Sequence, residues 1–140
     1  MEESQIEFHS EGVFILENQV KIRQWFEATA KSEGKHIGAL NYIFCDDEYL
    51  IKINVEFLQH DTYTDIITFD YSVGDELISD IYISTERVAE NAKEFGETFD
   101  GELNRVLIHG LLHLCGYKDK TEEEAILMRS KENYYISLQA

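Results

Sequence analysis

The sequence predicts an α+β fold in which a small mixed sheet of four strands is covered by about five helices. Apolar residues switch several times along the chain between a helical period near 3.6 and the alternation that suits a strand. Two strand-like segments are adjacent in the second half, and three helix-like segments follow them. The resulting order, β-α-β-α-β-β-α-α-α, is typical of a domain whose helices cover a mixed sheet.

The first elements are expected to be a short strand and a helix. The strand is predicted over 12–16. Asn18 is suited to cap the helix that follows, because its side chain can accept a hydrogen bond from a free backbone N–H, and Gly34 is placed to end this helix. The apolar positions of the helix fit the helical period: Val20, Ile22, Trp25, Phe26 and Ala30.

The middle of the chain is expected to contain three strands and one helix. A β-like run covers 39–45, and an amphipathic helix follows over 46–58. The segments 65–72 and 77–84 are rich in Ile, Thr, Tyr and Phe, which favour strands. The turn at Gly74 between them predicts an antiparallel hairpin.

Three helices are expected after the hairpin. Ser84 can cap a helix over 85–95, and a second helix over 100–114 contains two histidines. Thr121 and Glu124 match the capping box, in which each residue satisfies a backbone N–H near the other, so they are expected to open the last helix.

The composition suits one compact domain over residues 1–140. A chain of 140 residues with 44% hydrophobic and 12% aromatic residues can build a single core. It has no run of about 18 uncharged apolar residues, and its N-terminus, Met-Glu-Glu-Ser, is acidic where a secretory signal would be basic and then apolar. We therefore expect a cytoplasmic protein without a membrane span, in which Cys45 and Cys115 are reduced.

The charge balance weighs against a nucleic-acid substrate without excluding it. With 12 basic and 28 acidic residues, the net charge of −16 should repel polyanions unless the basic groups cluster. A bound divalent cation reverses the local sign of the field, so an acidic protein can still engage a phosphate at its metal. Charge alone leaves the substrate open.

The segment 109–119, HGLLHLCGYKD, contains the residues best suited to chemistry. His109 and His113 are four residues apart on a predicted helix, so both imidazoles lie on one face and can bind one ion. Gly116 can adopt a left-handed conformation, which would end the helix and return Asp119 to the same ion. Three protein ligands with an open fourth position are typical of catalytic zinc. We predict one Zn²⁺ per chain, bound by these three residues.

A structural role is the alternative for the two histidines, because such pairs also occur by chance on ordinary helices. Two buried imidazoles side by side would need hydrogen-bond partners, which a metal makes unnecessary. Metal ligation is favoured because the apolar neighbours of the pair predict a buried helix: Val106, Leu107, Leu111, Leu112 and Leu114.

The same spacing resembles the site of the metzincin proteases, so a metallopeptidase is the natural competitor. The protease motif has Glu directly after the first histidine as its general base. This chain has Gly110 there, which cannot transfer a proton. The spacing of the metal ligands is kept while the peptidase base is missing.

Three blocks of the sequence resemble the YbeY family of bacterial rRNA maturation factors. The run HGLLHLCGY over 109–117 is similar to the family signature H-G-x-L-H-L-x-G-Y-D-H, and DIYIS over 80–84 is similar to its G-D-I-x-I-S strand. The family segment N-x-x-Y-R-x-x-D-x-P-T-D-V-L-S-F resembles a third block, formed by Asn54, Phe57, Asp61 and TDIITF over 64–69.

This resemblance implies a small α+β metalloprotein of the cytoplasm that cuts single-stranded RNA. It also implies a role in ribosomal RNA maturation and ribosome quality control, with ribosomal RNA or a ribosomal subunit as partner. Three positions depart from the family pattern. The third histidine is Asp119, whose carboxylate also binds zinc. The family's proline is Tyr63, and its arginine is Leu58, so a cation expected to stabilise phosphate is missing there.

Two further residues are catalytic candidates. Asp65 opens a strand in the matched block, and a carboxylate commonly orients a zinc-bound histidine or accepts a proton; the alternative is a turn residue. Arg105 is one helical turn before His109 and could supply the cation that Leu58 does not. The alternative for Arg105 is an ordinary surface residue.

Three functions from different classes fit these observations. A metal-dependent endoribonuclease is favoured over a metallopeptidase or other metallohydrolase, against which Gly110 argues. A non-enzymatic ribosome-associated protein with structural zinc is the third, although structural zinc is usually closed by four protein ligands. Leu58 keeps that third interpretation open. For the ribonuclease, attack by hydroxide formed at the zinc and attack by the RNA 2′-hydroxyl both agree with the residues.

Overall fold

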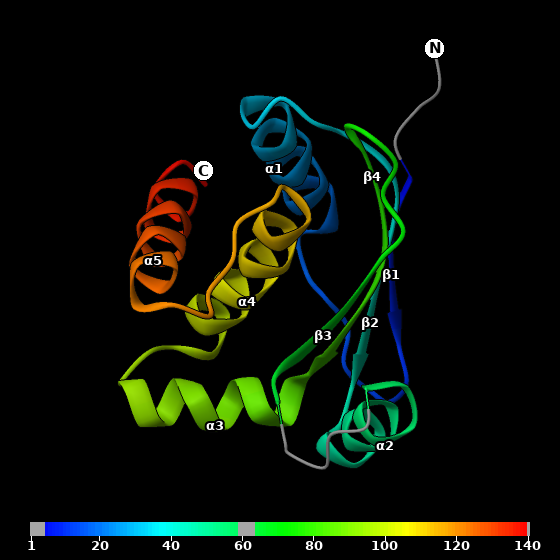
Figure 1. The fold of residues 1–140 in the computed structure, drawn as a ribbon. Helices are drawn as coiled ribbons and strands as arrows, with labels where there is room; N and C mark the ends of the chain where they lie inside the picture. The colour runs from blue at the N-terminus through cyan, green and yellow to red at the C-terminus, as the bar shows by residue number, and fades with distance from the viewer. Residues whose placement is uncertain (1–4, 59–63, 140) are drawn as a thin grey trace.

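The computed structural model describes residues 5–58 and 64–139, and its elements follow the predicted order (Figure 1). Asp61 and Tyr63 of the matched segment lie outside the described residues. The elements are β1 (Gln5–Ser10), α1 (Gln19–Ser32), β2 (His36–Cys45), α2 (Asp47–Leu58), β3 (Ile66–Asp70), β4 (Glu76–Ser84), α3 (Thr85–Phe95), α4 (Phe99–Leu114) and α5 (Glu122–Ser137).

The four strands form one mixed sheet in the order β1-β2-β4-β3. β2 pairs in parallel with both β1 and β4, whereas β3 and β4 form an antiparallel hairpin that places Ile67 opposite Tyr82. Gly74 has a φ of +59° in the hairpin turn, which a glycine adopts without strain. The predicted hairpin and the predicted α+β class are both confirmed.

The helices lie mainly on one face of the sheet (Figure 1). The larger core lies between this face and α1, α4 and α5, and it includes Tyr42, Ile81 and Leu107, all fully buried. Because successive residues of a strand point to opposite faces, Ile67 of β3 faces the other side, where it packs with Leu50 of α2 in a smaller core. The site described below lies on the side of the larger core.

The strand predicted over 12–16 is wrong, because these residues form an irregular connection. Both sides of β2 are already paired, one with β1 and one with β4, so this segment cannot join the sheet beside β2. Val13 and Ile15 are left exposed. The strand lies earlier, in β1, where Ile6 is buried and Phe8 half-buried between polar residues that face outward.

The side-chain cap predicted at Asn18 is also wrong. Its backbone has φ 59° and ψ 37°, and its side chain makes no capping hydrogen bond. A capping side chain reaches the helix from an extended backbone, whereas the left-handed backbone of Asn18 points it elsewhere. The other predicted caps are confirmed: Ser84 accepts from the N–H of Arg87, and Thr121 and Glu124 form a capping box.

None of the helices among the described residues is long and apolar enough to cross a lipid bilayer.

Candidate metal centre

Helix α4 places His109 and His113 on one face. The opposite face is buried in the core, with Leu107, Leu111 and Leu112 fully inaccessible to solvent. The two imidazole centroids are 4.5 Å apart, and the two Nε2 atoms are 2.9 Å apart. Burial of one face therefore fixes the direction of both imidazoles, as the i, i+4 spacing predicts.

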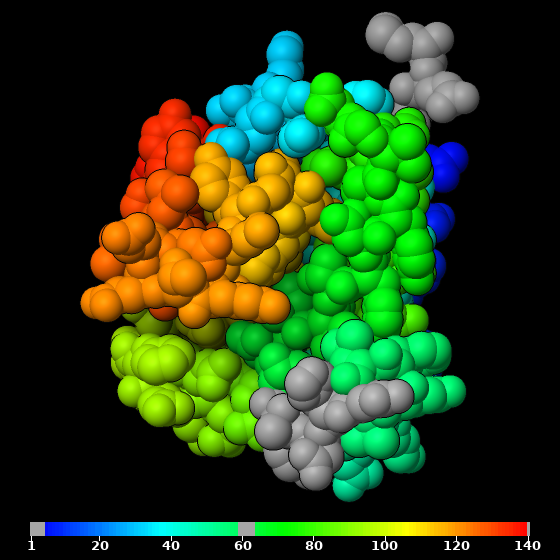
Figure 2. All heavy atoms as spheres, viewed as in Figure 1, coloured from blue at the N-terminus to red at the C-terminus, as the bar shows by residue number. Residues whose placement is uncertain are grey.

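The end of α4 returns the chain toward these histidines. Gly116 has a φ of +107°, and the N–H groups of Gly116 and Tyr117 donate to the carbonyl oxygens of His113 and Leu112. This pair of bonds is a Schellman motif, which ends a helix with a residue of positive φ. In Figure 2 the turn and the start of α5, in orange, lie against the later half of α4.

Asp119, in this turn, completes a cluster of three potential metal ligands. Its Oδ2 lies 3.2 Å from Nε2 of His109 and 3.4 Å from Nε2 of His113. Ligands of one tetrahedral zinc ion, each about 2.0–2.1 Å from it, are separated by roughly 3.3 Å. The two distances to Asp119 match this spacing, and the 2.9 Å between the two Nε2 atoms is slightly shorter. The three residues are of types that bind zinc.

The hydrogen bonds of the two Nδ1 atoms explain why this cluster can bind a cation. Nδ1 of His113 is 2.9 Å from the carbonyl oxygen of Tyr117, which can only accept, so this nitrogen carries the proton. Nδ1 of His109 is 2.6 Å from Oε2 of Glu132 and donates to it. In the neutral imidazoles, both Nε2 atoms then present lone pairs toward Asp119. A proton or a metal ion must lie among these lone pairs.

Glu132 was missed by the sequence analysis. It lies on the buried side of α5, between Met128 and Tyr135, and only 5% of its side chain is exposed. Its Oε1 accepts from Nη1 of Arg105 at 2.9 Å, while its Oε2 accepts from His109. The sequence does contain a signal for Glu132, because it is a charged residue on the inner face of an amphipathic helix. Such a buried carboxylate needs a partner, which marks it as a candidate site residue.

Charge and burial shift the pKa values of this pair in opposite directions. Burial lowers the pKa of His109, but the hydrogen bond and charge of Glu132, with the charges of Asp119 and Asp65, outweigh it and raise the pKa above the usual 6.5. Burial raises the pKa of Glu132, but the bonds from His109 and Arg105 outweigh burial and lower it below 4.5. In the metal-free protein, these two shifts favour the imidazolium form of His109 and the carboxylate form of Glu132.

The structure also places the two catalytic candidates. Asp65 precedes β3, and its Oδ2 accepts from Nδ2 of Asn91 at 3.5 Å. Burial raises its pKa, and the charge of His109 lowers it to a smaller extent, so the two groups are close enough to interact. Arg105 faces the site, but its Nη1 is bonded to Glu132. The roles of Asp65 and Arg105 in catalysis remain predictions.

Gly110 faces the sheet and not the histidines. A Cβ atom at this position would lie 2.9 Å from Cδ1 of Ile66 and 3.7 Å from Cγ2 of Ile81. The absence of a side chain therefore lets α4 approach β3 and β4 closely. A glutamate at this position would require the side chain of Ile66 to move.

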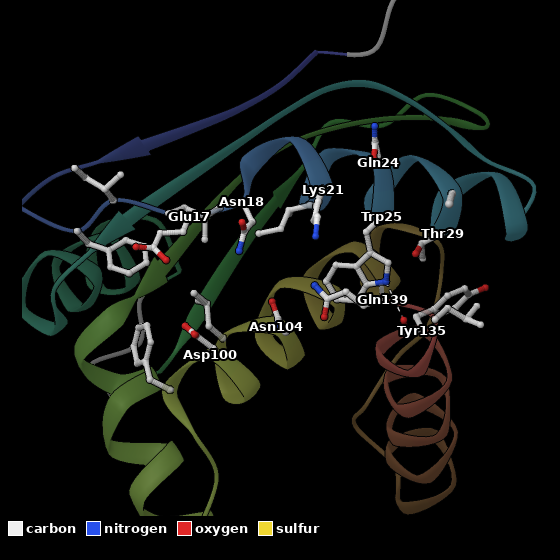
Figure 3. A pocket seen from close by; sticks show the side chains of 18 of the residues that line it. Glu17, Asn18, Lys21, Gln24, Trp25, Thr29, Asp100, Asn104, Tyr135 and Gln139 are labelled. Carbon is white, nitrogen blue, oxygen red and sulfur yellow. Dashed lines mark hydrogen bonds between the residues drawn. The ribbon is translucent and has the colours of Figure 1, made fainter.

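A separate cavity of about 810 Å³ lies between α1 and the facing ends of α4 and α5 (Figure 3). Trp25, Leu103 and Tyr135 are among the residues that line it, and none of His109, His113 and Asp119 does. Nε1 of Trp25 donates to the carbonyl oxygen of Tyr135 at its wall. The candidate site is therefore identified by its three converging ligand atoms, and it lies apart from this cavity.

Residues 5–138 match the family model described as Endoribonuclease YbeY. The chain is similar to the Endoribonuclease YbeY of Christiangramia forsetii, with 59% identity over 99% of this chain and 96% of the relative. The protein of that name from Flavobacterium johnsoniae is 56% identical over 95% of this chain and 96% of its own length.

A solved structure shows the same fold. The solution structure of a protein from Thermotoga maritima has a TM-score of 0.63 and 30% sequence identity, covering 94% of this chain and 87% of the other. The family match extends across the predicted ligand residues and Glu132.

Proposed function

The chain belongs to the endoribonuclease YbeY family, and from that premise we propose that it is a zinc-dependent endoribonuclease specific for single-stranded RNA. The observation that carries this proposal is the convergence of Nε2 of His109, Nε2 of His113 and Oδ2 of Asp119. We further propose that it acts in ribosomal RNA maturation and ribosome quality control in the cytoplasm, as a single domain over residues 1–140.

His109, His113 and Asp119 would hold the ion. Glu132 and the carbonyl of Tyr117 position the two imidazoles by fixing a proton on each Nδ1, which leaves Nε2 as the ligand atom. When bound, zinc supplies Lewis acidity toward a phosphoryl oxygen and toward water. Because no fourth side chain belongs to the cluster among the described residues, one coordination position is left for water or substrate.

Asp65 is the proposed proton acceptor. Burial raises the pKa of this carboxyl, and a carboxylate of raised pKa is a better base than an exposed one. It would take the proton either from water or from the RNA 2′-hydroxyl. A substrate with one 2′-deoxy nucleotide separates these routes, because cleavage 3′ of that nucleotide is lost only if the 2′-hydroxyl attacks.

The position of Gly110 argues against the competing metallopeptidase. A peptidase of this ligand pattern needs its general base directly after the first histidine. Here that position faces Ile66 in the core. The proposed activity therefore depends on RNA as the substrate, and a peptide should not be cut.

Metal analysis combined with an RNA cleavage assay tests this proposal. We expect close to one zinc per chain and cleavage of a labelled single-stranded RNA that a chelator abolishes and zinc restores. Asp119→Ala should weaken both zinc binding and cleavage, while Asp100→Ala, a matched change at the other end of α4, should weaken neither. Metal without cleavage would favour a non-enzymatic ribosome-associated protein, and absence of metal would refute the proposed centre.

A further inference from the structure

Three cationic side chains surround the carboxylate of Glu132, and two of them are hydrogen-bonded to it. Oε2 accepts from His109 at 2.6 Å and Oε1 accepts from Arg105 at 2.9 Å. A third cation, Arg129, lies one turn earlier on α5, with its Nε 3.7 Å from Oε1. This distance is an ion pair without a hydrogen bond. The carboxylate of Glu132 is therefore satisfied without Arg129.

Arg105 and Arg129 differ in how much of each side chain reaches solvent. Arg105 is 22% exposed and is bonded to Glu132, whereas Arg129 is 61% exposed. Among the described residues, the contact with Glu132 is the only ion pair of Arg129. Its two terminal nitrogens are thus available in the planar, forked arrangement that binds phosphate with two hydrogen bonds.

The carboxylates around the metal centre favour a further cation beside it for an RNA substrate. Three carboxyl groups lie near one another here: in addition to burial, the charge of Glu132 raises the pKa of Asp65, and the charges of both raise the pKa of Glu102. Asp119 adds another carboxylate. A phosphate that approaches this group is repelled unless cations compensate. At the family's arginine position this chain has Leu58, which carries no charge.

We infer that Arg129 binds a backbone phosphate of the RNA strand beside the metal centre. Its position at i−3 from Glu132 aligns it with the residue that holds His109, so a strand that reaches the ligands passes the guanidinium. This inference rests on the proposed function, since it assigns a substrate contact to the same site.

Arg129→Gln tests it, with Lys21→Gln as the matched loss of one exposed positive charge at the cavity wall. We expect Arg129→Gln to raise the KM for single-stranded RNA about fivefold at low salt, with little change in kcat. The slope of log Kd against log salt should fall by about 0.7, the share of one phosphate contact on a single strand. Arg129→Lys should keep this slope, and Lys21→Gln should behave as wild type.

Binding of a labelled oligoribonucleotide, followed by fluorescence anisotropy, measures Kd without requiring cleavage. If the wild type binds RNA but does not cut it, the proposed function fails, while the salt slope still tests Arg129. An unchanged KM and salt slope in Arg129→Gln would overturn the inference. So would a loss of zinc or a change confined to kcat, because Arg129 would then act through Glu132.

Discussion

The proposed metal centre is built from two regions that hold their ligand residues differently. His109 and His113 lie on a helix buried along one side, and each Nδ1 is bonded to a second group. Asp119 lies in a turn and is 40% exposed, and among the described residues its ion pairs are with the two histidines. The fold fixes the two helical side chains, whereas the side chain of Asp119 is held mainly by its interactions at the site.

This difference indicates that the two helical ligands set the affinity for the metal ion, whereas the turn ligand can adjust its coordination. Ligands that are positioned before the ion arrives lose little conformational freedom on binding. An exposed carboxylate in a turn can change its coordination at little cost to the fold, so it tunes the charge of the site. We therefore expect the two regions to respond unequally to substitution.

The largest effect is expected from His113→Ala compared with Asp119→Asn. Loss of the helical ligand should weaken zinc binding more than about 100-fold, because even partners that do not touch a metal are worth 10–100-fold. Loss of the turn ligand's charge should cost about tenfold. Competition with a chromophoric chelator measures both affinities, and circular dichroism should show most of the helix retained in each variant. Equal losses would remove the distinction between the two regions.

A smaller effect should follow Glu132→Gln, which tests how the helical ligands are held. Glutamine can still accept a hydrogen bond, but it removes the charge that stabilises the imidazolium of His109 and pairs with Arg105. Zinc affinity should fall about 10-fold to 100-fold. Glu124→Gln, in the exposed first turn of the same helix, is the control. Unchanged affinity would mean that packing alone directs His109.

The smallest effect is expected in the dependence of stability on pH. Because the folded pKa of His109 is raised, its contribution in the metal-free protein is full below 6.5 and is lost as pH rises through the raised value. The lowered pKa of Glu132 gives a contribution that is present above 4.5 and is lost as pH falls. Their interaction therefore stabilises the metal-free fold most between these two values.

With zinc bound, stability should instead increase as the pH rises above neutral, since protons on the histidines compete with the ion. The rise in melting temperature on adding zinc should be a few degrees larger at about pH 8 than at about pH 6. Scanning fluorimetry with and without metal at both pH values measures the difference. A rise that is equal or smaller at the higher pH would contradict the titration assigned to His109.

The sequence was sufficient where the information is local. His109, His113, Gly116 and Asp119 lie within one helix end and its turn, so spacing alone predicts that they meet. The hairpin and the helix over 85–95 were predicted for the same reason, since their turn and cap residues are adjacent in the chain. Local backbone chemistry determines all of these features.

What could not be predicted depends on packing between distant segments. Glu132 reaches His109 across 23 positions, and no motif links them, because the contact depends on how α5 lies against α4. The irregular connection over 12–16 is similar: whether a segment becomes a strand depends on an available partner, and β1 had already taken the edge of β2. Asn18 failed as a cap because the chain turns there.

Gly110 limits how this enzyme could evolve. In the motif, a single substitution, glycine to glutamate after the first histidine, separates a site of this ligand pattern from that of a peptidase. A Cβ atom at position 110 would lie 2.9 Å from Cδ1 of Ile66, so that substitution would bring a carboxylate against β3 and would require Ile66 to move. The two activities are adjacent in sequence, but the change from one to the other depends on accompanying movement in β3.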